Sequence, residues 1–175
     1  MKPIFWIDLE MTGLDEKKDH ILEVAVVVTD TEFKTLEEFH QVVYQSPEIV
    51  ANMNDWCKKV HGESGLTALI PRGKPLAEVE SELLELVQRH FSDKDRIVLA
   101  GNSVGNDKRF IDEYMPTFAQ RLHYRVIDVS SFKEIFREKY KISVPKKNTH
   151  RAVDDIYESI HELNTYLSYV QIPKT

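Results

Sequence analysis

Two acidic residues stand two positions apart in the stretch Pro3–Leu14. Asp8 and Glu10 follow the apolar run at positions 4–7, and such a run predicts a central strand covered on both faces. Side chains two apart on a strand share a face, so the two carboxylates should lie side by side. Like charges held this close are costly unless a cation lies between them, which predicts a divalent metal site. The alternative is that one acid faces solvent while the other caps the turn at Thr12 and Gly13.

A third acid, Asp107, lies in the polar stretch that follows the short apolar run Ile97–Ala100. The run predicts a buried strand that stops at Gly101, and Asp107 then stands where a helix begins. A sheet exposes functional groups at such strand-to-helix transitions. The alternative is an ordinary first-turn acid, which the helix dipole favours.

The fourth acid lies near the start of a long C-terminal amphipathic segment. The buried face of that segment is set by Val153, Ile156, Ile160, Leu163 and Leu167. At about 100° per residue, Asp155 falls on the flank of this apolar stripe and Asp154 points nearly opposite, into solvent. His150 would lie about 140° from Asp155 on a regular helix, so it can share a site only from a loop or a frayed first turn.

The elements that must position these residues follow from periodicity and turn signals. Besides the first strand, the sequence predicts strands at Ile21–Thr29, Phe33–Tyr44, Ile97–Ala100 and His123–Val129. It predicts helices at Asn52–His61, Pro75–Phe91, Asn106–Leu122 (strained by Pro116), Ser130–Tyr140 and His150–Val170, with loops at Gly62–Gly73 and Lys141–Asn148. Three successive strands indicate an antiparallel start, and the later alternation of helix and strand indicates an α/β mixed sheet flanked by helices.

The composition fits one globular domain. The 175 residues are 42% hydrophobic and 30% charged, and the single cysteine, Cys57, excludes an intrachain disulfide framework. With no signal-like or membrane-spanning run, we expect a cytoplasmic protein. The formal net charge of -6 disfavours a binder of long nucleic acid, but it permits a short substrate whose phosphates are neutralised by metal ions.

Taken together, the segments DLE at 8–10, GNSVGND ending at Asp107, and HRAVDD at 150–155 resemble the DEDDh exonucleases and, within them, the oligoribonuclease family. DLEMTGLD, DWCKKVHG and HYRVIDVS strengthen the likeness, which spans nearly the whole chain. The resemblance implies a ribonuclease-H-like fold with a five-stranded sheet, in a single exonuclease domain over residues 1–175. It also implies metal-dependent 3′-to-5′ hydrolysis of very short RNA, above all dinucleotides, to nucleoside 5′-monophosphates.

The same resemblance implies roles for individual residues. Asp8, Glu10, Asp107 and Asp155 would hold two hard cations, Mg²⁺ or Mn²⁺, which prefer oxygen ligands. Such a pair of ions serves in-line displacement at phosphorus. His150, with an ordinary pKa of about 6.5, would take the proton from the attacking water.

Substrate recognition is implied in the same way. Leu14 would wedge between two bases and Trp56 would stack on one of them, although either could instead be a core residue. Tyr124 and Arg125 would reach the active site of a partner subunit, which implies a homodimer. The substrate's 5′-terminal phosphate would be ringed by Ser103, Arg125, Ser130 and Ser131, although serines after a strand are commonly helix caps.

Two other functions remain open on the sequence alone. A DEDDh exonuclease acting on longer single-stranded RNA or DNA would share the metal site but should have an open, basic channel. A catalytically inactive nuclease-like binding module is disfavoured by the complete set of acids and His150.

Overall fold

A computed structural model describes residues 2–145 and 151–171 of the chain. The strands are β1 (Ile4–Met11), β2 (Ile21–Thr29), β3 (Thr35–Val42), β4 (Ile97–Gly101) and β5 (Leu122–Asp128). The helices are α1 (Pro47–Ala51), α2 (Asp55–Glu63), α3 (Leu66–Leu69), α4 (Leu76–His90), α5 (Gly105–Tyr114), α6 (Pro116–Ala119), α7 (Val129–Ile135) and α8 (Ala152–Ser168). A 3-10 turn, η1 (Ile70–Arg72), follows α3, and a π-helical turn, η2 (Phe136–Tyr140), extends α7. None of the helices in these described ranges has the length and apolar character needed to cross a bilayer.

The strands form one mixed sheet in the order β3-β2-β1-β4-β5. The first three strands are antiparallel neighbours, whereas β4 and β5 run parallel to β1. β1 therefore lies at the centre of the sheet, as its apolar run predicted. The sequence-based fold class, a five-stranded mixed sheet with an antiparallel start and flanking helices, is confirmed.

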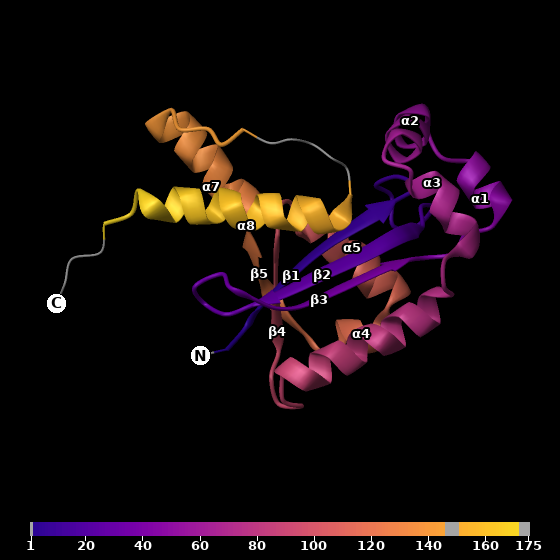
Figure 1. Cartoon of the computed structure of the whole chain (residues 1–175), viewed down its shortest axis with the longest axis horizontal. Coiled ribbons are helices and arrows are strands. Elements are labelled where there is room, and N and C mark those ends of the chain that lie inside the picture. The colour runs from indigo at the N-terminus through magenta and orange to yellow at the C-terminus, as the bar shows by residue number, and fades with distance from the viewer. Residues whose placement is uncertain (1, 146–150, 172–175) are drawn as a thin grey trace.

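Helices cover both faces of the sheet (Figure 1). On one face, Phe5, Ile7 and Leu9 of β1 pack with apolar residues of α4 and α5. On the other face, Trp6 packs with the buried stripe of α8, which includes Ile156, Ile160 and Leu163. The alternation along β1 thus places Trp6, Asp8 and Glu10 on the face that α8 covers.

The helices α1, α2 and α3 gather beyond the end of β1 that carries the acids (Figure 1). α2 begins at Asp55, where the side chain of Asn54 accepts a hydrogen bond of 2.8 Å from the N–H of Cys57. Cys57 is buried with Leu22 and Leu66 in a separate apolar cluster that fixes these helices to the sheet. This arrangement holds α2 next to the turn that follows β1.

Several element boundaries differ from the sequence prediction. The expected helix Asn106–Leu122 is two helices, because Pro116 starts α6 and Met115 before it leaves the helical conformation, with φ -128° and ψ 62°. The expected loop Gly62–Gly73 contains α3 and η1, and α1 was missed altogether. The third strand is shorter than Phe33–Tyr44 at both ends.

Candidate metal centre and substrate cavity

Three carboxylates from two distant segments converge on the covered face of the sheet. Asp8 and Glu10 of β1 and Asp155 of α8 each present one carboxylate oxygen, and these oxygens all lie within 4.8 Å of one another. The three side chains are partly buried. Oxygen atoms in such an arrangement are the ligands that hard divalent cations prefer.

The packing of α8 explains why Asp155 reaches the strand. Ile156, the next residue, is 1% exposed and packs against the cluster around Trp6, two residues before Asp8. Asp155 therefore lies on the flank of the buried stripe, as its helical position predicted. Asp154 is exposed, which also agrees with the periodicity.

Asp107 lies beside this group but is held differently. It belongs to the first turn of α5 and is 5% exposed. Its Oδ1 accepts a hydrogen bond of 2.9 Å from the backbone N–H of Leu9, the residue between Asp8 and Glu10. Gly101 brings β4 close to β1 just before this point, because a Cβ at Gly101 would lie 2.8 Å from the carbonyl oxygen of Ile7. The fourth predicted acid is thus anchored to the strand that carries the first two.

Burial and mutual repulsion make these acids hard to ionise. Burial, followed by the charges of Asp107, Glu10 and Asp155, raises the pKa of Asp8 well above its usual range. Burial and the neighbouring carboxylates, Asp155 foremost, raise the pKa of Glu10 to about 8. Burial raises the pKa of Asp107 to about 7, although the hydrogen bond from Leu9 opposes the shift. A bound divalent cation would remove this penalty, so the residues present fit a metal ion.

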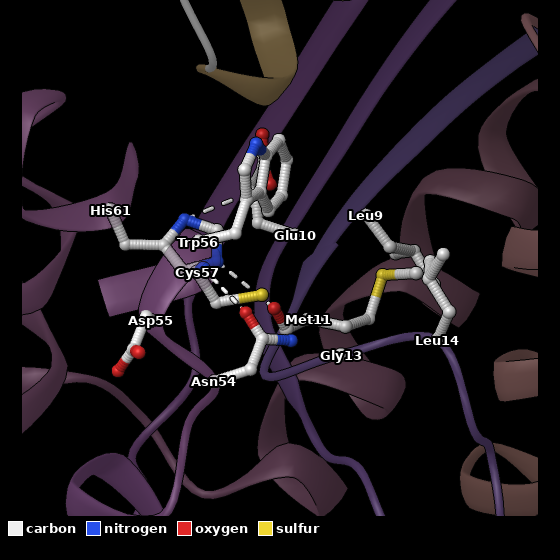
Figure 2. A pocket seen from close by; sticks show the side chains of 10 residues that line it. All are labelled: Leu9, Glu10, Met11, Gly13, Leu14, Asn54, Asp55, Trp56, Cys57 and His61. Carbon is white, nitrogen blue, oxygen red and sulfur yellow. Dashed lines mark hydrogen bonds and ion pairs between the residues drawn. The ribbon is translucent and has the colours of Figure 1, made fainter. Parts of the chain in front are cut away.

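A cavity of about 580 Å³ opens next to Glu10. Trp56 of α2 and Leu14 of the turn after β1 both line it, and Figure 2 shows them coming from separate segments around the cavity. These side chains are 62% and 66% exposed, respectively, so both present apolar surface to the cavity. Neither is a core residue, so the core alternative that the sequence left open is wrong for both.

The turn that presents Leu14 is fixed by one carboxylate. Asp19 accepts hydrogen bonds of 2.9 Å from the hydroxyl of Thr12 and from the N–H of Asp15. Gly13 lies against the same group, because a Cβ there would be 2.4 Å from an oxygen of Asp19. Leu14 is therefore held in place by the turn rather than by burial of its own side chain.

Two of the three predicted phosphate-binding serines meet near the ends of β4 and β5. The N–H of Ser103 donates to the Oδ1 of Asp128 at 3.0 Å and to the Oγ of Ser130 at 2.8 Å. Ser103 has a positive φ of 52°, a strained conformation for a residue with a side chain. The hydroxyl of Ser130 donates its single hydrogen to Asp128. Ser131 is exposed in the first turn of α7.

Tyr124 and Arg125 lie on β5, at the edge of the sheet. Tyr124 is 76% exposed, and the guanidinium of Arg125 lies 5.3 Å from the centre of its ring. Neither residue is among those that line the cavity beside Glu10 in the described chain. His150, the predicted base, lies outside the described residues.

Two site residues escaped the sequence analysis. His61 of α2 is 1% exposed; its Nε2 donates to the carbonyl of Met11 at 2.9 Å, and its Nδ1 lies 3.8 Å from a carboxylate oxygen of Glu10. Glu23 of β2 is fully buried directly opposite Glu10 in the antiparallel ladder. An acid inside the apolar run of β2 was the one available signal for Glu23, whereas nothing in the sequence separated His61 from the other histidines.

Comparison with protein families places the chain among known proteins. A family described as exonuclease, RNase_T, matches residues 5–163. A probable oligoribonuclease of Dictyostelium discoideum is 51% identical over 169 residues, covering 94% of this chain and 88% of that protein. A mitochondrial oligoribonuclease of Homo sapiens is 46% identical, covering 92% of this chain and 70% of the relative. An oligoribonuclease of Francisella tularensis is 42% identical, with 93% of both chains covered.

Solved structures agree on the fold. An Escherichia coli exonuclease I bound to single-stranded DNA superposes with a TM-score of 0.74 at 12% identity. The match covers 96% of this chain but 41% of the exonuclease I chain, so the present chain spans about two fifths of that protein. At this identity the likeness concerns the fold alone.

Proposed function

Because the chain belongs to the oligoribonuclease family of exonucleases, we propose that it is a metal-dependent 3′-to-5′ exoribonuclease in a single exonuclease domain. Its substrates are very short RNA oligonucleotides, dinucleotides above all, and its products are nucleoside 5′-monophosphates. The observation that carries the proposal is the convergence of Asp8, Glu10 and Asp155, within 4.8 Å of one another, beside a cavity with exposed apolar walls.

The acids are proposed to hold two divalent cations, Mg²⁺ or Mn²⁺. Asp8, Glu10, Asp107 and Asp155 supply only carboxylate oxygens, which suit these ions rather than zinc or copper. When bound, two such ions stabilise the attacking and leaving oxygens of an in-line displacement at phosphorus. In the protein, the buried carboxylates fix where the scissile phosphate binds, and His150 accepts the proton of the attacking water.

The apolar walls of the cavity are proposed to bind the bases. Trp56 stacks on one base and Leu14 inserts between the two, interactions that are indifferent to base identity. Because the turn around Asp19 already holds Leu14 in place, little conformational freedom is lost when a dinucleotide binds. This accounts for recognition of short RNA by a protein with a net charge of -6.

Length selection is proposed to depend on the 5′-terminal phosphate. Ser103, Ser130 and Ser131 lie at one end of the sheet, and a phosphate bound there would close the site to longer chains. Tyr124 and Arg125 are proposed to complete the pocket of a partner subunit in a homodimer. Their exposure on an edge strand supports this role, because an edge strand is available for contact with a second chain. A cytoplasmic location stays a prediction, since the relatives include both bacterial and mitochondrial oligoribonucleases.

Hydrolysis rates on RNA substrates of increasing length test the proposal. With Mg²⁺ present, kcat/KM should be highest for 5′-phosphorylated dinucleotides and fall with each added nucleotide, and a chelator should abolish turnover. A rate that rises with length would instead support an exonuclease for longer single strands. A chain that binds dinucleotides but does not cleave them in Mg²⁺ or Mn²⁺ would be an inactive binding module.

A further inference from the structure

Glu23 is a fully buried carboxylate that the proposed chemistry does not use. It stands on β2 with 0% exposure, paired with Glu10 across the antiparallel ladder. A buried charge is costly unless it is ion-paired and hydrogen-bonded. The partners of Glu23 therefore indicate what the residue is for.

Those partners come from the beginning of α8 and from β3. The Oε1 of Glu23 accepts from the Nη2 and Nε of Arg151 at 2.9 and 3.2 Å, and it lies 2.6 Å from the Nε2 of His40. The Oε2 accepts from the backbone N–H of Ala152 at 3.2 Å. Both oxygens are thus used, and both hold the residues with which α8 begins.

Glu23 thereby caps the N-terminus of α8, although it belongs to β2 and not to the helix. Arg151 is the N-cap residue of α8, and its own side chain makes no capping hydrogen bond. The N–H groups of a first helical turn need acceptors, and a negative charge there is stabilised by the helix dipole. In the same turn, the N–H of Asp155 donates to the carbonyl of Arg151 at 3.0 Å. One hydrogen-bonded path therefore links Glu23 to Asp155.

Small side chains allow this close approach. Ala25 of β2 and Ala152 of α8 are both fully buried in the cluster around Trp6. Ala25 stands opposite Asp8 in the ladder, so the start of α8 lies over the part of the sheet that carries the acids. A shift at this end of the helix would carry Asp155 with it.

We propose that Glu23 is a positioning residue that fastens the start of α8 to β2 through Arg151 and Ala152, and so holds Asp155 against Asp8 and Glu10. The inference rests on the proposed function, because it takes these three acids as the metal ligands. Glu23 itself touches neither substrate nor metal in this account. Its effect on the reaction passes through Asp155.

A second trio of the same residue types provides a matched control. Glu37 of β3 pairs with Arg89 and with His90, each with a contact of 2.6 Å, and joins the sheet to α4. It has the same chemistry as Glu23 with Arg151 and His40, but its side chain is 30% exposed and its ion-pair partners lie on α4. Glu37→Gln removes a comparable ion pair without disturbing the start of that helix.

The experiment measures Mn²⁺ binding by titration calorimetry and turnover of a 5′-phosphorylated RNA dinucleotide, for wild type, Glu23→Gln and Glu37→Gln. Glu23→Gln should weaken Mn²⁺ binding by about 10- to 100-fold, as loss of a partner behind a metal ligand does, and lower kcat. The KM for the dinucleotide should not change, because Trp56 and Leu14 lie on other elements. Glu37→Gln should behave as wild type in all three quantities.

Wild-type Mn²⁺ affinity in Glu23→Gln would overturn the inference, and so would equal losses in both variants, which would indicate general destabilisation. A wild-type chain that binds Mn²⁺ without cleaving dinucleotides would defeat the proposed function, while the Mn²⁺ comparison would still decide the role of Glu23. If circular dichroism shows that Glu23→Gln does not fold, Arg151→Lys replaces it. Lysine keeps the charge but lacks the guanidinium fork, so weaker Mn²⁺ binding supports positioning and unchanged binding refutes it.

Discussion

Asp107 accepts a hydrogen bond from the backbone of Leu9, the residue that separates Asp8 from Glu10 in β1. The acid from α5 is thus fixed to the strand through a main-chain group. An asparagine could accept the same hydrogen bond through its amide oxygen. The charge of Asp107 can therefore be removed while its anchor is kept.

Asp107→Asn should lower kcat on an RNA dinucleotide by at least about a hundredfold, or about 2.7 kcal/mol of transition-state stabilisation. The Tm without metal should be unchanged or higher, because the repulsion between Asp107 and Asp8 disappears. Asp112→Asn is the control, since Asp112 lies on the same helix but pairs with Lys108 at the surface. Full metal-dependent turnover in Asp107→Asn would remove this residue from the site.

The stability of the metal-free protein should fall as the pH rises. The pKa of Glu10 is raised from 4.5 to about 8 and that of Asp107 from 3.8 to about 7. Between about pH 4 and pH 8 the folded state binds more protons than the unfolded state. The stability that is present below pH 4 is therefore lost as the pH rises to about 8.

We expect a loss of several kcal/mol in the free energy of unfolding across this range, because a pKa difference of one unit corresponds to about 1.4 kcal/mol; urea denaturation in a chelator measures it. Saturating Mg²⁺ should reverse the trend above neutral pH, because the cation binds the ionised acids of the folded state only. A metal-free stability that rises from pH 5 to pH 8 would contradict the buried cluster.

His150→Ala should keep Mn²⁺ affinity and lose turnover at neutral pH by about 10²- to 10⁴-fold, the usual contribution of a general base. His161→Ala provides the comparison, because His161 is an exposed histidine on α8. The measurement is single-turnover cleavage of a dinucleotide alongside Mn²⁺ calorimetry. Equal turnover in the two variants would assign the proton transfer to another group.

Trp56→Ala should raise the KM for dinucleotides by roughly 5- to 150-fold, the equivalent of about 1 to 3 kcal/mol of base stacking. The Tm should hardly change, since the indole is 62% exposed. Leu14→Ala should act in the same direction. Leu36→Ala truncates a similarly exposed leucine on β3, outside the cavity, and should leave KM unaltered. An unchanged KM in Trp56→Ala would exclude base stacking at this wall.

Local sequence patterns predicted two kinds of element well: strands that are buried on both faces and helices that bury one face. Ile21–Thr29 matches β2 residue for residue, because a run of β-branched side chains is bounded there by polar residues. In α8, the apolar stripe fixed the buried face of the helix, and this placed Asp155 on the flank of that face and Asp154 in solvent. Alternation thus paired Asp8 with Glu10 and helical phase selected Asp155, but the family resemblance predicted that these two segments meet at one site.

The remaining features depend on contacts between segments far apart in sequence. Register across the sheet puts Glu23 opposite Glu10, and no single-strand pattern contains that pairing. The short helices in 62–73 are held by the burial of Leu66 and Ile70. The glycines and the proline of this segment predicted a loop, so the sequence did not indicate these helices. The family resemblance, rather than periodicity, singled out Leu14 and Trp56.

The acids of β1 meet Asp155 only after α8 has packed onto the sheet, and α8 follows every other described element in the chain. A polypeptide emerging from the ribosome therefore carries Asp8 and Glu10 long before it carries Asp155. Nuclease activity should therefore arise only once α8 has been synthesised and has packed onto the sheet.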